Sequence, residues 1–365
     1  MDSAKESSAP ETGAQYRCSS CGAPVTFDPS QQALACEHCG NSDAVKIPLE
    51  EIPEHCIAEA LRRPERKGYD IPVRRMRCQS CGATVDLDPG VVAGKCAFCG
   101  ASAVASVEEE SRVWRPESLL PFKVSRDEAA HAYHKWLSSL WFRPGDLKDS
   151  AINEISGVYL PYWTFDARAD SWWTADAGYH YYETVTYKDS QGNTKTRRER
   201  RTRWEPASGR HYDEYRNVPI YASQGLPVSI CRAIEPYPWE NMAAYDPRFL
   251  SGFGAEEYVV DAVEGWSRGQ ERMNGWEREK CSRLVPGDTQ RNLRVVTRFS
   301  EAKFRHVLLP VWIVAYSYKG KTYRFLANGQ TGKASGKAPY SWVKISATVL
   351  IAILVLVLLG LYLGM

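Results

Sequence analysis

Residues 18–39 read CSSCGAPVTFDPSQQALACEHC, and residues 78–99 read CQSCGATVDLDPGVVAGKCAFC. Both stretches have the spacing C-x2-C-x14-C-x2-C, and each cysteine of the first copy recurs sixty positions later. This spacing is typical of a four-thiolate zinc site. The two copies therefore predict tandem zinc ribbons at residues 16–47 and 76–107, called here the first and second ribbon. Their predicted ligands are Cys18, Cys21, Cys36 and Cys39, and then Cys78, Cys81, Cys96 and Cys99.

Four thiolates complete a tetrahedral shell, so two Zn²⁺ ions are expected, with structural rather than catalytic roles. Glycine follows every CxxC pair, as suits a tight turn with positive φ. Iron also accepts tetrahedral sulfur ligands, so the spacing alone leaves zinc and iron open. Disulfides would require an oxidising compartment, and residues 1–15 lack the apolar segment of a secretory signal. His38 is expected at the surface because four thiolates are already present.

Residues 345–365, ISATVLIAILVLVLLGLYLGM, contain no charged side chain. At about 1.5 Å per residue this length crosses a hydrocarbon core of roughly 30 Å. The stretch is predicted to be one transmembrane helix that anchors the chain by its tail. Positive charge precedes it and none follows, so the body is expected in the cytosol and the protein in the cytoplasmic (inner) membrane. The preceding lysines are Lys333, Lys337 and Lys344.

The composition is that of a globular protein, with 44% hydrophobic residues, 25% charged residues and a net charge of +2. This balance lacks the overall basic character of a dedicated nucleic-acid-binding protein. The predicted fold class is α+β, with a β-rich antiparallel body and flanking helices. The predicted segments are a disordered terminus (1–15), the first ribbon, a linker (48–75), the second ribbon, the body (116–330), a juxtamembrane linker (331–344) and the terminal helix (345–365).

Local signals predict several elements of the body. Ser125 and Glu128 form a capping box for a helix that runs to about Leu140. Residues 157–187 alternate as a strand, with a break at 169–170, and lead into hairpin turn residues at 189–193. Helical periodicity extends over 255–284, although glycines weaken it. A shorter helix is expected within 49–63.

A weaker repeat lies inside the body. Leu160-Pro161-Tyr162-Trp163 resembles Leu309-Pro310-Val311-Trp312, and each copy leads into a strand. A second hairpin turn is expected at 319–321. These similarities predict two related β units within 116–330.

The returning arm of the first hairpin is rich in basic residues. Such a cluster could contact the phosphates of anionic lipid or of nucleic acid, or it could be a charged edge strand that discourages association. The alternation of basic and acidic residues along it fits an exposed hairpin at least as well. The residues of this basic cluster are Lys195, Arg197, Arg198, Arg200, Arg201 and Arg203.

No nucleotide-binding or hydrolytic motif is found, so no enzymatic activity is predicted. NGQTGKASGK (328–337) resembles a phosphate-binding loop only superficially. The required glycine five residues before Gly-Lys is replaced by Ala327 in one register and by Thr331 in the other, and no Ser or Thr follows either lysine. A turn-rich linker toward the terminal helix is the better interpretation.

The paired ribbons, LPYWTFD (160–166), NGQTGK (328–333) and the terminal span together resemble a bacterial family of membrane-anchored, TFIIB-type double zinc-ribbon proteins. Its members are often labelled "primosomal protein N′ (replication factor Y), superfamily II helicase". The chain lacks a Walker motif and has no room for two motor domains, so the helicase activity is not carried over. The resemblance implies a membrane scaffold that acts beside SPFH (flotillin-like) or phage-shock-type proteins.

These features predict a non-enzymatic, membrane-tethered adaptor whose ribbons and body recruit protein partners. The ribbons themselves are close to neutral, which favours protein over nucleic acid as the partner. The alternative is a nucleic-acid-binding, replication-linked protein that uses the ribbons and the basic cluster at 195–203.

Overall fold

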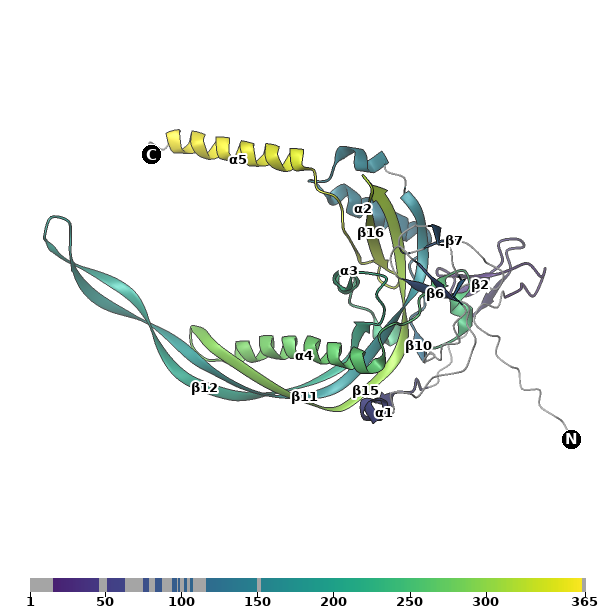
Figure 1. Cartoon of the computed structure of the whole chain (residues 1–365), viewed down its shortest axis with the longest axis horizontal. Helices are drawn as coiled ribbons and strands as arrows, with labels where there is room; N and C mark the ends of the chain where they lie inside the picture. Colours follow the sequence, from purple (N-terminus) through teal and green to yellow (C-terminus); the bar gives the residue numbers. More distant parts are fainter. Residues whose placement is uncertain are drawn as a thin grey trace.

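The chain has a mixed α/β structure built around one large, curved, mainly antiparallel sheet (Figure 1). The computed structural model describes residues 16–45, 51–62, 75–78, 83–86, 94–96, 98, 102–103, 106–107, 116–149 and 152–362. The terminus predicted to be disordered lies outside these residues, as do two of the predicted zinc ligands, Cys81 and Cys99.

Four strands form most of the sheet: β11 (Ile152–Lys188), β12 (Thr194–Tyr221), β15 (Thr289–Tyr318) and β16 (Lys321–Asn328). β11 lies between β12 and β15 and runs antiparallel to both. Both predicted hairpin turns are confirmed, since residues 189–193 join β11 to β12 and residues 319–320 join β15 to β16. The predicted break at 169–170 is absent, because both residues keep their partners on β12 and β15.

The two segments of the weak repeat are neighbouring strands of this one sheet rather than the cores of separate β units. Leu160 on β11 lies opposite Leu309 on β15, and the flanking residues pair in the same register. Antiparallel pairing runs the two similar segments in opposite directions. Leu160 and Leu309 are therefore the one matched pair that meets, while Pro161 lies opposite Leu308 and Tyr162 opposite Val307. Both segments are buried within the sheet, which accounts for their shared apolar character.

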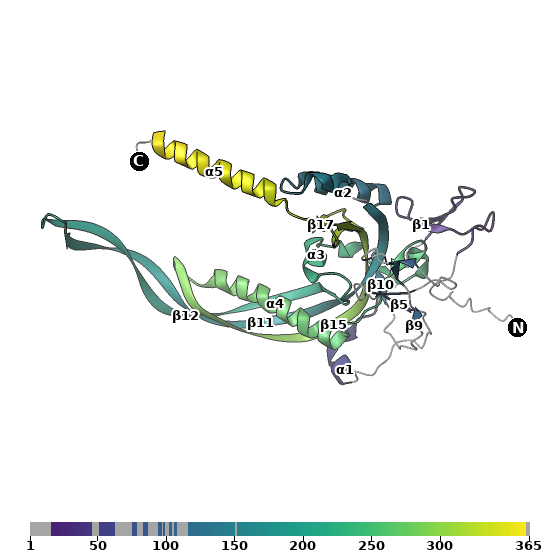
Figure 2. The ribbon, with the colours of Figure 1, turned by 45° about the horizontal axis from the view of Figure 1, so that its top comes forward.

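Beyond the last pair of β11 with β15, Gly178 with Thr289, only β11 and β12 continue. Residues 179–203 form this two-stranded extension, called here the arm. Figures 1 and 2 show the arm reaching away from the body, on the same side as the terminal helix α5 (Trp342–Tyr362). Most of its side chains are exposed on both faces.

Helix α4 (Ala262–Leu284) lies along the concave face of the sheet (Figures 1 and 2). It begins at Ala262 rather than at residue 255, because Asp261 caps it by accepting from the Glu264 N–H at 2.8 Å. Its glycines do not break it. A Cβ at Gly265 would lie 2.8 Å from Trp163, so glycine at this position permits close packing of the helix on the sheet.

Helix α2 (Arg126–Ser139) confirms the predicted capping box. Ser125 Oγ accepts from the Glu128 N–H at 3.3 Å, and Glu128 Oε2 accepts from the Ser125 N–H at 2.7 Å. The helix buries Tyr133 against Phe325 of β16, with ring centroids 5.1 Å apart. Helix α1 (Ile57–Arg62) is shorter than the predicted 49–63.

Shorter elements complete the body. Strands β4 (His55–Cys56), β10 (Ser118–Leu119), β13 (Ala243–Ala244), β14 (Gly254–Ala255) and β17 (Ala334–Gly336) belong to the large sheet. The remaining helical segments are α3 (Val228–Ala233) and the 3₁₀ turns η1 (Gly145–Asp149), η2 (Trp239–Asn241) and η3 (Pro247–Leu250).

The ribbons form small sheets of their own. The first holds β1 (Thr26–Asp28), β2 (Ala33–Ala35) and β3 (Ser42–Ala44). The second holds β5 (Arg75–Arg77), β6 (Thr84–Asp86), β7 (Gly94–Lys95), β8 (Ser102–Ala103) and β9 (Ser106–Val107). The first ribbon packs in a core that includes Tyr159, whereas the second packs in one that includes Leu160. Successive residues of a strand face opposite sides, so the ribbons cover opposite faces of the sheet.

Candidate metal centre and membrane helix

The four cysteines of the first ribbon lie together. Cys18 Sγ is 3.5 Å from Cys39 Sγ, and Cys21 Sγ is 3.6 Å from Cys36 Sγ. All four sulfurs lie within 4.8 Å of one another. A tetrahedral Zn²⁺ with bonds of about 2.3 Å would hold its sulfurs roughly 3.8 Å apart. The group is therefore compatible with one zinc ion, as the spacing predicts.

Two matching backbone turns position these sulfurs. The Gly22 N–H donates to the Cys18 carbonyl and the Gly40 N–H to the Cys36 carbonyl, each at 2.9 Å. Gly22 and Gly40 have φ of 73° and 74°, which confirms the predicted positive φ. Glycine adopts this conformation without the steric cost that a Cβ would bring.

The electrostatics of the cluster favour a bound cation. Backbone N–H groups of Cys21 and Ser20 point at Cys18 Sγ and lower the pKa of that thiol to about 6. At Cys39 the Asn41 N–H favours the thiolate, but the sulfurs of Cys21 and Cys18 outweigh it and raise the pKa to about 12. Four adjacent thiolates repel one another unless a divalent cation compensates their charge, and a coordinated thiol loses its proton.

The first ribbon is fixed to the body by its apolar side. Phe27 packs edge-on against Phe249, with centroids 5.1 Å apart, and its N–H donates to the Ser251 carbonyl at 2.9 Å. The two CxxC turns are exposed at Cys21 and Cys39, whereas Cys18 and Cys36 are buried. His38 is exposed beside them, as expected.

The described residues of the second ribbon repeat the backbone β-pairing of the first ribbon, with every position displaced by sixty residues. Arg17 pairs with Pro24 in the first copy and Arg77 with Thr84 in the second. Likewise, the pairs of β2 with β3 recur in register between β7 and β8. Cys78 and Cys96 are buried. Because the other two ligands lie outside the described residues, a second metal centre stays a prediction.

Helix α5 is 21 residues long. Its most apolar stretch has a mean hydropathy of 2.7 and contains no buried residue. Within the described residues it is the one helix long and apolar enough to cross a membrane, so the chain is compatible with a single span. A bilayer core does not accept the charged arm that projects on the same side. Membrane insertion of α5 therefore requires an orientation of the helix that keeps the arm outside the bilayer core.

The predicted basic cluster lies on β12, which is an edge strand of the sheet. Arg197, Arg201 and Arg203 share one face of the arm with Glu199, and four of the six cations have a carboxylate partner. These ion pairs are Lys195–Asp189, Arg197–Glu199, Arg201–Glu183 and Arg203–Glu205. The opposite face carries Arg198, which stacks over the Tyr182 ring at 5.0 Å, and Arg200. The arrangement matches the exposed-hairpin interpretation.

A buried polar cluster under α4 was not predicted. Glu277 is fully buried and accepts from Ser171 Oγ and Tyr215 Oη, each at 2.6 Å. His211 and Asp213 lie near it, and Lys280 forms an ion pair with Asp213. Lys280 offsets the charge of Asp213, and the hydroxyls of Ser171 and Tyr215 stabilise the Glu277 carboxylate, so these contacts hold α4 on the sheet. The available signal in the sequence is that Glu277 lies four residues from both Met273 and Cys281, on the apolar face of the helix.

Comparison with known proteins identifies a relative but no family. The chain is 29% identical over 344 residues to a protein of Bacillus subtilis (strain 168) that bears the name "Uncharacterized protein YdjG". The similarity covers 91% of this chain and 92% of that relative. No family model and no solved structure matches. The chain thus resembles a protein of similar length whose name states no activity.

Proposed function

We propose that this chain is a membrane-tethered adaptor without catalytic activity. Helix α5 holds the body at the cytoplasmic membrane, two structural Zn²⁺ ions order the ribbons, and the ribbons and body recruit cytosolic or membrane proteins. The rigid packing of the first ribbon on the body supports this proposal, because a fixed surface loses less conformational entropy when a partner binds.

The exposure of the two CxxC turns of the first ribbon is the observation that carries the proposal. The apolar side of this ribbon is already used against Phe249, while Glu37 and His38 stand exposed between its last two ligands. Four thiolates leave no open coordination position for a substrate, so the metal orders the turns rather than performing chemistry. What it presents outward is a protein surface.

A second candidate function is binding of nucleic acid through the arm. Arg198 and Arg200 favour it, because they face the side of the arm that carries no acidic residue. Against it, carboxylates partner the other four cations of the basic cluster. DNA binding that weakens steeply with salt and is lost in the Arg198→Ala, Arg200→Ala variant would support this alternative.

Affinity capture from detergent extracts tests the adaptor. The full chain is compared with the Cys18→Ser, Cys36→Ser double variant, and the Cys56→Ser variant is the matched control because Cys56 is exposed and lies outside the cluster. Partners of the intact chain are expected with the control and absent from the double variant. SPFH-type and phage-shock-type proteins are the classes that the family resemblance suggests.

A surface variant separates docking from folding. Glu37→Lys with His38→Ala leaves all four sulfurs in place and changes only exposed side chains. If the same partners are captured with this variant and with the cysteine double variant, recruitment through the first ribbon is refuted. Loss of partners with both variants, while metal content falls only in the cysteine variant, supports docking on the outward turns.

A further inference from the structure

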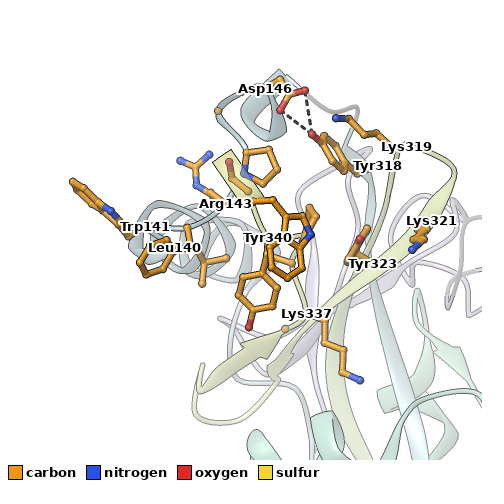
Figure 3. A pocket seen from close by; sticks show the side chains of 18 of the residues that line it. Leu140, Trp141, Arg143, Asp146, Tyr318, Lys319, Lys321, Tyr323, Lys337 and Tyr340 are labelled. Carbon is orange, nitrogen blue, oxygen red and sulfur yellow. Dashed lines mark hydrogen bonds between the residues drawn. The ribbon is translucent and has the colours of Figure 1, made fainter. Parts of the chain in front are cut away.

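A cavity of about 1240 Å³ lies at the base of α5 (Figure 3). Three separate segments line it: residues 136–146 at the end of α2, the turn between β15 and β16, and residues 336–343 leading into α5. Ser341 and Lys344 connect the start of α5 to the end of α2, through donation to the carbonyls of Phe142 at 2.6 Å and Trp141 at 3.3 Å. The cavity therefore lies where the chain would enter a bilayer.

Arg143 is a buried cation in the wall of this cavity. It is only 9% exposed, and its Nε makes no hydrogen bond within the part of the chain that the structure describes. A buried donor without a partner costs free energy that a bound acceptor would recover. The unsatisfied Nε of this cation points to an anionic ligand.

The other charged groups of the cavity reinforce this preference. Lys319, Lys321 and Lys337 line it, and its single carboxylate is that of Asp146. Figure 3 shows the Tyr318 hydroxyl donating to Asp146, with Oη–Oδ distances of 3.0 and 3.2 Å, so this carboxylate already has a partner. The lining thus contains four basic groups and one acidic group, and this excess of positive charge is complementary to a phosphate ester.

The rim of the cavity is apolar and aromatic. Trp141, Tyr340 and Trp342 are 77%, 72% and 75% exposed, although large aromatic side chains are usually buried in a water-soluble protein. Trp and Tyr prefer the level of the lipid headgroups, where the ring is in an apolar environment and the polar tip meets water. An occupant with both a phosphate and acyl chains matches this lining.

We propose that this cavity binds the phosphate headgroup of one anionic glycerophospholipid from the membrane that α5 enters. Arg143 holds the phosphate, the lysines around the cavity supply further positive charge, and the acyl chains leave past the aromatic rim along α5. All of the charged lining groups lie outside α5, whereas Trp342 and Val343 of the lining belong to its first turn. The inference shares only the membrane role of α5 with the proposed adaptor and involves no protein partner.

Lipid binding is measured on the full chain, delipidated in detergent micelles, by native mass spectrometry and by quenching of tryptophan fluorescence with brominated lipid. The probes are phosphatidylglycerol, phosphatidylcholine and inorganic phosphate. Arg143→Gln is expected to weaken phosphatidylglycerol binding about tenfold or more, as the loss of a charge-assisted contact does. The pair Lys319→Gln, Lys321→Gln should weaken binding while leaving thermal unfolding unchanged, because both side chains are exposed.

Lys135→Gln is the matched control. It makes the same charge change on an exposed position of α2 outside the cavity, so binding should stay within about twofold of the parent. Equal affinity of the parent and Arg143→Gln for phosphatidylglycerol would overturn the proposal. The proposal would also be overturned if the parent bound phosphatidylcholine as tightly as phosphatidylglycerol, because the apolar rim alone would then account for lipid binding. Displacement of the lipid by inorganic phosphate at similar concentration would show that the site takes free phosphate instead.

Discussion

Replacing Glu256 by glutamine should stabilise the protein above neutral pH. Glu256 is 2% exposed, and its carboxylate accepts from Ser223 Oγ at 2.6 Å and Tyr221 Oη at 2.7 Å. Burial raises its pKa from 4.5 to about 7; the two hydroxyls oppose this shift and the nearby sulfur of Cys96 adds to it. A zinc ion with four thiolates keeps a net negative charge, so metal binding at the second ribbon would also raise the pKa of Glu256.

The direction of the pH dependence follows from where each state loses its proton. Between pH 4.5 and about 7 the unfolded chain has lost this proton and the folded chain keeps it. The free energy of unfolding therefore falls as pH rises through this window. The gap of about 2.5 pH units corresponds to a loss of about 3 kcal/mol in the free energy of unfolding, and this loss is complete above pH 7. Glutamine does not ionise, and its amide can accept from one of the two hydroxyls and donate to the other, so the variant avoids this loss.

Urea unfolding of the full chain in detergent micelles, followed by tryptophan fluorescence at pH 5 and pH 8, measures the effect. The difference in unfolding free energy between Glu256→Gln and the parent should become more favourable to the variant by about 2–3 kcal/mol from pH 5 to pH 8. Glu271→Gln, an exposed carboxyl on α4, is the control and should show no such change. An equal difference at both pH values would refute a raised pKa at Glu256.

Three further outcomes are expected. Cys36→Ser should lower bound metal by one ion per chain in elemental analysis, and Cys56→Ser should not; unchanged zinc in the first variant would exclude the four-sulfur site. Deleting residues 345–365 should release the protein from carbonate-washed membranes into the soluble fraction, and retention would disprove anchoring by α5. Gly287→Ala, at φ 91° and with a carbonyl oxygen 2.7 Å from the new Cβ, should cost about 2 kcal/mol in thermal unfolding. Gly275→Ala, with open space around it, should stabilise slightly, and equal effects would contradict the strain at Gly287.

Features set by neighbouring residues could be predicted from the sequence. The capping box of Ser125 and Glu128, the turn at 189–193 and the positive φ of Gly22 and Gly40 all match the structure. The four cysteines of the first ribbon also come together as their spacing predicts. Each of these depends on contacts across at most about twenty residues, where backbone conformational preferences and ligand spacing decide the outcome.

The length of the strands was not evident from local signals. β11 passes through residues 169–170 because partners on both sides satisfy its backbone. For Asp170 these partners are Tyr212 on β12 and Arg298 on β15, which lie 42 and 128 residues away along the chain. In the same way, the similarity of Leu160 and Leu309 gave no indication that the two segments pair. A local break signal is overridden when a buried backbone can hydrogen-bond only within the sheet.

The sequence by itself determined the CxxC turns of the first ribbon, the hairpin turns and an apolar C-terminal helix, predicted at 345–365 and found at 342–362, since each depends on composition or on spacing along the chain. Tertiary structure alone decided which distant polar groups meet. Glu277 reaches Ser171 and Tyr215 across the sheet, and the cavity beside Arg143 is assembled from three segments. Side-chain burial and strand register fix these contacts, and both arise from packing of the whole chain rather than from any local preference.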